Sequence, residues 1–172
     1  MLIILTGKSG TGKTTIIKEL QKYGFIYPPS YTTRPKRLND DKICIPYNEF
    51  VKHLNDFVEY VQYNGHYYGR KKEDLLQAKH ANLVVDLEPK GLQTYIDFCK
   101  KNDIDYYAIY LYCNDEKRLE NIRKDNTDID KNRLQRDDSY FDWYIANYDM
   151  VVNVQRLDMK KIVGVIRELT RM

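Results

Sequence analysis

Eight consecutive residues near the start of the chain match a phosphate-binding motif. Gly7 to Thr14 read Gly-Lys-Ser-Gly-Thr-Gly-Lys-Thr, which fits the P-loop pattern G-x-x-x-x-G-K-Ser/Thr. Glycines permit a turn whose backbone N–H groups point inward, and the N-terminus of the following helix adds a positive dipole. Such a loop would hold the phosphates of ATP. The residues predicted to bind ATP here are Gly7, Lys8, Ser9, Gly10, Thr11, Gly12, Lys13, Thr14 and Thr15.

Two oxygen-bearing side chains are candidates for a magnesium site. The Thr14 hydroxyl occupies the motif position that ligates Mg²⁺, while Lys13 reaches the β- and γ-phosphates. Asp86 closes an apolar run, as the aspartate of a second nucleotide-binding motif would. An alternative interpretation makes Asp86 a strand-end residue that caps the next helix.

The surrounding sequence predicts the elements that would position these residues. Apolar runs alternate with amphipathic stretches, which favours an α/β fold: a parallel sheet of the P-loop NTPase type, flanked by helices. Buried strands are expected at 2–6, 25–27, 83–87, 106–112 and 150–152, and helices at 13–22, 71–80, 89–99, 115–123 and 158–169, with another ending near 146. Asn64-Gly65 predicts a hairpin between strands at 57–63 and 66–68.

Composition limits the class of protein. The chain has 172 residues, which suits one domain, and a net charge of +3, which is too small to imply wrapping of nucleic acid. Its apolar runs are too short to cross a bilayer, so no membrane partner is expected. Cys44, Cys99 and Cys113 are widely spaced and predict neither a disulfide framework nor a zinc site. We therefore expect a soluble, cytoplasmic protein, either a monomer or a homodimer.

Segments beyond the loop narrow the choice among P-loop proteins. The Asn-Lys-x-Asp motif of GTPases is missing from the sequence. Residues 30–37, Ser-Tyr-Thr-Thr-Arg-Pro-Lys-Arg, resemble the Ser-x-Thr-Thr-Arg-x-x-Arg signature of guanylate kinases. The segments at 57–60 and 64–69, ending in Tyr-Tyr-Gly, and the strand end at 85–91 are also similar to that family, in the same order. The resemblance runs over nearly the whole chain.

This resemblance implies a nucleoside monophosphate kinase that transfers the γ-phosphoryl group of ATP to GMP or dGMP with Mg²⁺. It divides the single domain into a core (1–29, 81–117 and 140–172), an insertion that binds the monophosphate (30–80) and a lid (118–139). Asn153 would lie beside the adenine. The implied GMP-binding residues are Ser30, Arg34, Arg37, Tyr47, Glu59, Tyr68 and Glu88, and the implied catalytic residues are Lys13, Arg34, Arg123 and Arg133.

The sequence departs from the family pattern around the base. The stretch from Leu38 to Tyr47 is several residues short, Arg70 stands where the family has Ser or Thr, and Glu88 stands where it has Asp. These departures leave two alternatives open. One is a kinase for another or a modified deoxynucleotide. The other is a guanylate-kinase-like binding module without catalysis, although such modules usually lose the phosphate loop that is intact here.

Overall fold

The core is a parallel sheet in which the first strand lies near the centre. The computed structural model describes residues 1–37, 41–124 and 148–171. The strand order is β6-β1-β7-β8, with every pair parallel. The strands are β1 (Leu2–Thr6), β6 (Leu83–Asp86), β7 (Tyr106–Tyr112) and β8 (Met150–Asn153). Because parallel strands share their direction, the residues that follow β1 and β6 lie at one edge of the sheet.

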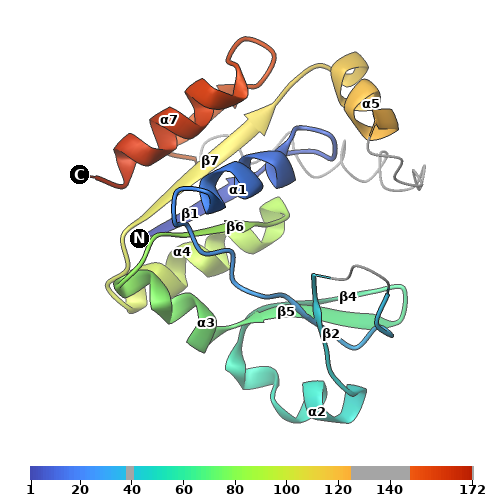
Figure 1. Cartoon of the computed structure of the whole chain (residues 1–172). Coiled ribbons are helices and arrows are strands. Elements are labelled where there is room, and N and C mark those ends of the chain that lie inside the picture. Colours follow the sequence, from blue (N-terminus) through green and yellow to red (C-terminus); the bar gives the residue numbers. More distant parts are fainter. Residues whose placement is uncertain (38–40, 125–147, 172) are drawn as a thin grey trace.

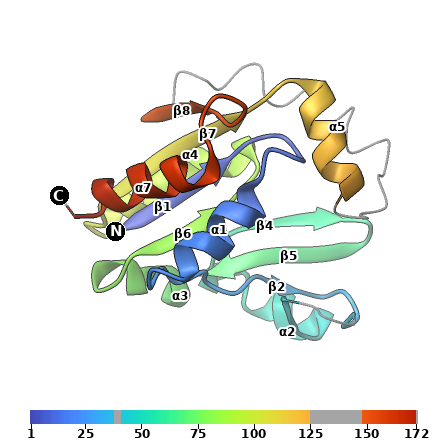
Figure 2. The ribbon, with the colours of Figure 1, turned by 45° about the horizontal axis from the view of Figure 1, so that its top comes forward.

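Helices cover both faces of this sheet (Figures 1 and 2). On one face α1 (Lys13–Gln21) and α7 (Met159–Leu169) pack against Ile3 and Leu5. On the other face α4 (Leu92–Lys101), α3 (Lys72–Leu76) and the 3₁₀ turn η2 (Gln77–Lys79) pack against Leu2 and Ile4. Alternate residues of β1 therefore enter opposite cores, as the period of two in a strand requires. None of the helices in the described ranges is long and apolar enough to cross a membrane.

A second sheet forms the insertion and lies below the core in the view of Figure 1. Its strand order is β3-β2-β5-β4. The elements are β2 (Tyr31–Thr32), β3 (Ile43–Cys44), α2 (Tyr47–Lys52), the 3₁₀ turn η1 (Leu54–Asp56), β4 (Phe57–Tyr63) and β5 (His66–Lys71). Aromatic rings fill its small core: the Phe50 ring stacks on Phe57 at 4.3 Å and on Tyr67 at 5.4 Å between centroids. Stacked rings supply apolar burial that so small a sheet could not obtain from aliphatic side chains alone.

Most predicted elements are present, with shifted ends. The Asn64-Gly65 hairpin is confirmed, but β5 continues to Lys71 rather than ending at Tyr68. The strand predicted at 25–27 is wrong: it is reduced to a single bridge between Ile26 and Leu83, because the prolines that follow cannot donate to a ladder.

The predicted helices differ in smaller ways. The helix predicted at 71–80 begins at Lys72, and its second half is the 3₁₀ turn η2. The helix predicted from Pro89 opens with the 3₁₀ turn η3 (Pro89–Gly91) before α4. The helix predicted to end near residue 146 lies outside the described residues.

Candidate active site

The glycine-rich loop connects the end of β1 to the start of α1, where the motif requires it. Gly12 precedes α1 with a left-handed φ of 88°, and α1 has no side-chain cap. The N–H groups of the first helical turn therefore face the loop rather than a capping side chain, which is the arrangement that binds phosphate. Lys13 Nζ donates to the carbonyl oxygens of Gly7 and of Lys8, the latter at 3.1 Å, so its ammonium group lies over the loop. Thr14 and Thr15 are exposed beside it.

Helix α5 (Asp115–Lys124) packs directly on this loop. Arg118, only 3% exposed, donates from Nε to the Ser9 carbonyl oxygen at 3.1 Å, and Asn121 donates to that of Gly10 at 2.8 Å. Gly10 has φ +82°, and a Cβ atom there would lie 2.6 Å from the Arg118 carbonyl oxygen. Residues 118–124 are predicted as the start of a lid. In the structure they belong to α5, whose side chains donate hydrogen bonds to the phosphate loop. Arg123 is exposed on its last turn, and Arg133 lies outside the described residues.

Asp86 ends β6 next to the loop, paired in register with Leu5. Its Oδ1 accepts hydrogen bonds from the Tyr27 hydroxyl at 2.8 Å and from Arg70 Nη2 at 2.9 Å. Burial raises the pKa of this carboxyl, but Arg70, Tyr27 and Lys13 outweigh it and hold the pKa below its usual range. Asp86 is therefore ionised. The alternative role as a helix cap is wrong, since η3 follows Glu88 and has no side-chain cap.

Glu59 enters the space between the insertion and the core. An irregularity in the pairing between Phe57 and Glu59 interrupts the regular register of β4, and a bulge of this kind re-aims the side chains next to it. The Glu59 carboxylate lies against Gly91, where a Cβ atom would be 2.3 Å from Oε2. Gly91 has φ −77° and ψ −17°, which any residue adopts, so the carboxylate rather than the backbone requires glycine there.

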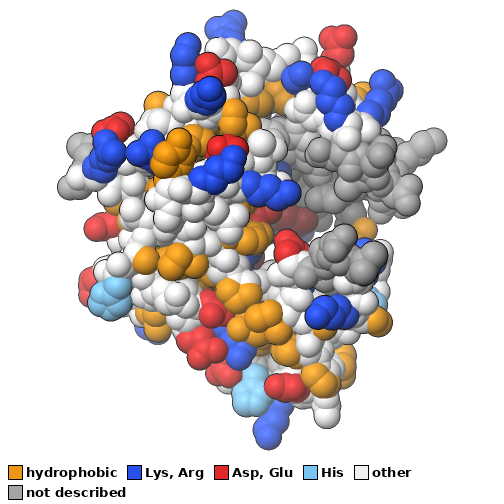
Figure 3. All heavy atoms as spheres, in the orientation of Figure 1, with side chains coloured by type: hydrophobic (Ala, Val, Ile, Leu, Met, Phe, Trp, Pro, Cys, Tyr) orange, Lys and Arg blue, Asp and Glu red, His pale blue; other side chains and the backbone are white. Residues whose placement is uncertain are grey.

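Electrostatics at Glu59 follow from this placement. Burial raises the pKa of the Glu59 carboxyl, the nearby Arg70 lowers it and Glu88 raises it, with a net increase. A half-buried carboxylate whose pKa is raised by burial is a feature that binding sites often share. In Figure 3, acidic side chains lie in the recess between the core and the insertion, below a rim of Lys and Arg.

Arg34 is the most deeply buried cation of the insertion's first loop, at 8% exposure. Its backbone N–H donates to the Thr32 hydroxyl at 3.1 Å, and its Nη1 donates to the Pro35 carbonyl oxygen at 3.1 Å. Arg37, its predicted companion, is exposed. A guanidinium carries five N–H donors in a planar fork, which matches the oxygens of an anion such as phosphate.

The other predicted residues lie at more scattered positions. Tyr68 is half-buried on β5, between Thr32 of β2 and Val61 of β4. Tyr47 is 58% exposed at the start of α2, and its ring lies 5.7 Å from that of Tyr67. The remaining three are Ser30, half-buried just before β2; Glu88, exposed after β6; and Asn153, at the end of β8, whose Oδ1 accepts from the Gln155 N–H at 2.9 Å.

Comparison with known proteins decides the family. The family model described as guanylate kinase matches residues 1–169. The chain belongs to the guanylate kinase family. It is 30% identical to a guanylate kinase of Rickettsia felis, covering 96% of this chain and 92% of the relative. It is also 30% identical to one of Lawsonia intracellularis, covering 84% of this chain and 76% of the relative.

Solved structures share the fold of this guanylate kinase family member. The crystal structure of a guanylate kinase from Anaplasma phagocytophilum superposes with a TM-score of 0.71 at 17% identity, over 99% of this chain and 84% of that one. A deoxyadenosine kinase from M. mycoides with bound dATP has a TM-score of 0.51 at 19% identity, and the match covers both chains fully. The predicted fold class, a parallel P-loop NTPase-type sheet flanked by helices, is confirmed.

Three residues of the site were not predicted as members of it. Arg70 was noted only as a departure from the family pattern, Tyr27 was assigned to a strand, and Gly91 was only part of a motif. The signal for Arg70 was available: a two-residue Asn-Gly turn sets the hairpin register and brings residues 59 and 70 close together. The contacts of Tyr27 and Gly91 depend on how the two sheets meet, which local patterns do not encode.

Proposed function

We propose that this protein catalyses transfer of the γ-phosphoryl group of ATP to GMP or dGMP. The observation that carries the proposal is the half-buried Glu59 carboxylate, which extends from the insertion against Gly91 of the core and has a raised pKa, in a chain with an intact phosphate-loop motif. The N1–H and 2-amino groups of guanine are two adjacent donors that one carboxylate can accept. Adenine lacks this donor pair and would leave the half-buried Glu59 carboxylate unpaired, a free-energy penalty that favours guanine.

On the donor side, the loop from Gly7 to Thr15 holds the phosphates of ATP, and Asn153 lies beside the adenine. Lys13 contributes a cation to the β- and γ-phosphates. The Thr14 hydroxyl and the ionised Asp86 carboxylate are hard oxygen donors that suit Mg²⁺, and the described residues contain no cluster of three His, Cys, Asp or Glu to hold a metal alone. These two residues would hold the ion together with nucleotide phosphates and water. When bound, Mg²⁺ would neutralise phosphate charge during transfer.

On the acceptor side, Arg34 and Arg37 bind the monophosphate, with Tyr68 and Tyr47 as hydroxyl donors. Ser30 and Glu88 assist Glu59 with the base. Arg123, and Arg133 beyond the described residues, would add positive charge over the transferring group when the nucleotides are in place. The protein then accelerates the reaction by orienting the two nucleotides and by stabilising negative charge on the transferring phosphoryl group. This mechanism requires no general base.

A coupled assay of ADP production with single monophosphates tests the proposal. We expect rates with GMP or dGMP at least about a hundredfold above those with AMP, dTMP or dCMP, since a site built to pair a donor edge rejects bases that lack it. Higher activity on dTMP or a dCMP derivative would favour a kinase for another base. A folded protein that produces no ADP with any acceptor would favour a non-catalytic binding module.

Substitution of Gly91 tests the space around Glu59. Gly91→Ala would push the Glu59 carboxylate aside without straining the backbone, so we expect an unchanged fold and a KM for GMP raised about tenfold to a hundredfold. The KM for ATP should not change. The control is Gly164→Ala in α7, where a Cβ atom meets nothing within 4 Å. It should leave both KM values unchanged and stabilise the helix by up to about 1 kcal/mol. Equal KM values for GMP in all three proteins would contradict the role of Glu59.

The raised pKa of Glu59 predicts a conflict between stability and binding. The carboxyl pKa is higher in the folded than in the unfolded protein, so folding favours the protonated form of Glu59. The stability that this protonation gives is fully present below the ordinary carboxyl pKa and is lost as pH rises through the raised pKa. Glu59→Gln should therefore melt at a higher temperature than the parent protein at pH 7, and the difference should shrink toward pH 4. Its affinity for GMP should fall at least about tenfold, because one guanine donor loses its charged acceptor.

Thermal unfolding between pH 4 and pH 8, with calorimetric titration of GMP, checks both parts. Glu49→Gln, which neutralises an exposed carboxylate of the same insertion, is the control and should show neither effect. A lower melting temperature for Glu59→Gln at pH 7 would mean that the ionised carboxylate stabilises the free protein, contrary to this account.

A further inference from the structure

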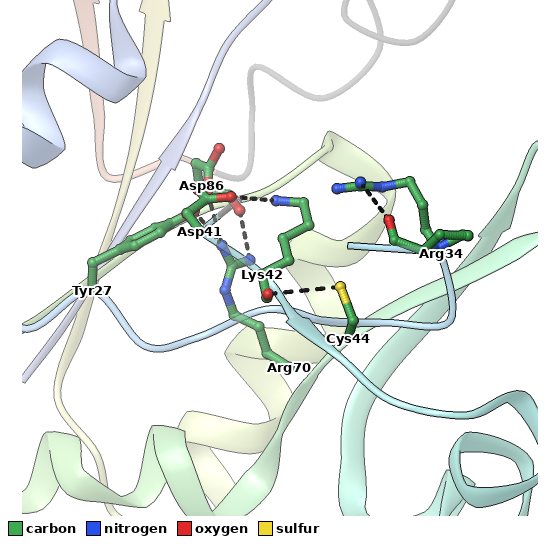
Figure 4. Close-up of polar contacts among 8 residues, drawn as sticks. Tyr27, Arg34, Asp41, Lys42, Cys44, Arg70 and Asp86 are labelled. Atoms are coloured by element: carbon green, nitrogen blue, oxygen red, sulfur yellow. Dashed lines mark hydrogen bonds and ion pairs between the residues drawn. The ribbon is translucent and has the colours of Figure 1, made fainter. Parts of the chain in front are cut away.

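Arg70 forms an ion pair that joins the two sheets of the molecule. It lies on β5 of the insertion and reaches Asp86 at the end of β6 of the core (Figure 4). Nη1 donates to the Asp86 backbone carbonyl oxygen at 2.9 Å, and Nη2 donates to Asp86 Oδ1 at 2.9 Å. Pairs such as Lys117–Glu120 and Lys124–Glu120, by contrast, lie along a single helix and on its surface.

Tyr27 completes the attachment from a third segment. Its hydroxyl accepts from Arg70 Nη2 at 2.8 Å and donates to Asp86 Oδ1 at 2.8 Å, and the guanidinium carbon lies 5.2 Å from the centre of its ring. The Arg70 side chain is 11% exposed. A planar fork with two acceptors on one residue and a ring against it has little freedom to move, unlike a solvated lysine.

Glu59 lies directly across the hairpin from Arg70. The two residues are paired in register between β4 and β5, so their side chains share a face of the insertion sheet. Arg70 points from that face to Asp86, and Glu59 points from it to Gly91, which follows Asp86 closely along the chain. The hairpin therefore contacts the core segment from Asp86 to Gly91 through two neighbouring side chains. Glu59 lies against Gly91, and Arg70 makes the hydrogen bonds to Asp86.

We infer that Arg70 is a positioning residue of the acceptor site, which anchors β5 to the end of β6 and thereby holds the Glu59 carboxylate where it accepts both donors of the guanine edge. This inference rests on the proposed role of Glu59 in base recognition. It assigns to Arg70 an effect on selectivity among bases, and not only on folding. Hypoxanthine supplies the sharpest comparison, because it keeps the N1–H donor of guanine and lacks the 2-amino group.

The test is calorimetric titration of the full chain with GMP, with IMP and with a non-hydrolysable ATP analogue. The parent protein should bind GMP at least about tenfold more tightly than IMP, which is the value of one hydrogen bond to a charged acceptor. In Arg70→Ala, which removes the ion pair without adding a new polar group, we expect GMP to bind about tenfold to a hundredfold more weakly, and the preference for GMP over IMP to fall below about threefold. Affinity for the ATP analogue, titrated without Mg²⁺ so that Asp86 has no ion to hold, should stay within about twofold.

Two further variants keep the test decisive if Arg70→Ala does not fold. Arg70→Lys retains the charge without the planar fork and should show an intermediate preference for GMP over IMP. Tyr27→Phe removes one hydroxyl from the attachment and should lower that preference by a smaller factor. The matched control is Lys71→Ala, which removes one positive charge from the adjacent position of β5, where the Lys71 ammonium group lies over the Tyr31 ring. It should leave the preference unchanged.

The possible results distinguish a failure of the role inferred for Arg70 from a failure of the proposed function. A parent protein that binds GMP no better than IMP would contradict the base assignment itself. A parent protein that prefers GMP, together with Arg70→Lys and Tyr27→Phe variants that keep the full preference, would overturn the role of Arg70 alone. Proportional weakening of GMP, IMP and the ATP analogue in the Arg70 variants would also overturn it, since a merely structural residue would affect all three.

Discussion

Replacement of Lys13 by alanine is expected to lower the turnover of GMP by at least about a hundredfold, with the fold retained. Lys13 lies over the loop on the carbonyl oxygens of Gly7 and Lys8, where its ammonium group meets the phosphates of a bound triphosphate. Loss of one preorganised charge at a transferring phosphoryl group has an effect of this size on turnover. The side chain is not part of either hydrophobic core, so the melting temperature should change little.

Steady-state rates with saturating GMP and ATP, together with thermal unfolding, measure this effect. Lys18→Ala is the matched control, because Lys18 belongs to the same helix α1 and is exposed. It should retain the parent turnover within about twofold. Unchanged turnover in a folded Lys13→Ala variant would remove the phosphate loop from the mechanism.

Replacement of Arg34 by alanine is expected to weaken GMP binding by about 2–4 kcal/mol, roughly thirtyfold to a thousandfold. Arg34 is only 8% exposed, so its charge would act on a phosphate with little screening by water. Arg34→Lys should recover only part of the affinity, because an ammonium group cannot bind phosphate oxygens through two parallel hydrogen bonds. Affinity for ATP should be unaffected by either change.

Titration of GMP and of guanosine distinguishes a phosphate contact from a base contact. Guanosine lacks the phosphate, so its weaker binding should be nearly the same in the parent protein and in Arg34→Ala. Lys36→Ala removes an exposed cation two positions away and should cost less than about threefold. An Arg34→Ala variant that loses affinity for guanosine as strongly as for GMP would show that Arg34 supports the site without contacting the phosphate.

The elements that local patterns encode were predictable from the sequence. The apolar run at Leu2–Thr6 followed by the glycine-rich loop identified β1 and the start of α1. Asn64-Gly65 identified the hairpin, because both residues adopt positive φ in its turn. The resemblance to the family then placed the candidate site residues in chain order, and one of them, Glu59, lies against Gly91 of the core.

The contacts between sheets could not be predicted in the same way. Arg70 and Asp86 meet because the insertion folds back on the carboxyl end of β6, and no periodicity in the sequence predicts this contact. Gly91 has an ordinary backbone conformation, so only the neighbouring Glu59 carboxylate explains the absence of a side chain. The resemblance to the family places Arg118 in the lid, whereas its position on α5 buries it against Ser9 of the loop.

Competition among nucleotides in a single mixture shows whether the phosphoryl group of ATP goes to a guanine nucleotide. The protein is incubated with ATP, Mg²⁺ and equal concentrations of GMP, AMP, CMP and dTMP, and the nucleotides are separated by chromatography at early times. Relative product amounts then report relative values of kcat/KM. The account predicts that GDP appears first and in step with loss of GMP. Earlier accumulation of another diphosphate, or release of phosphate without any new acceptor diphosphate, would contradict it.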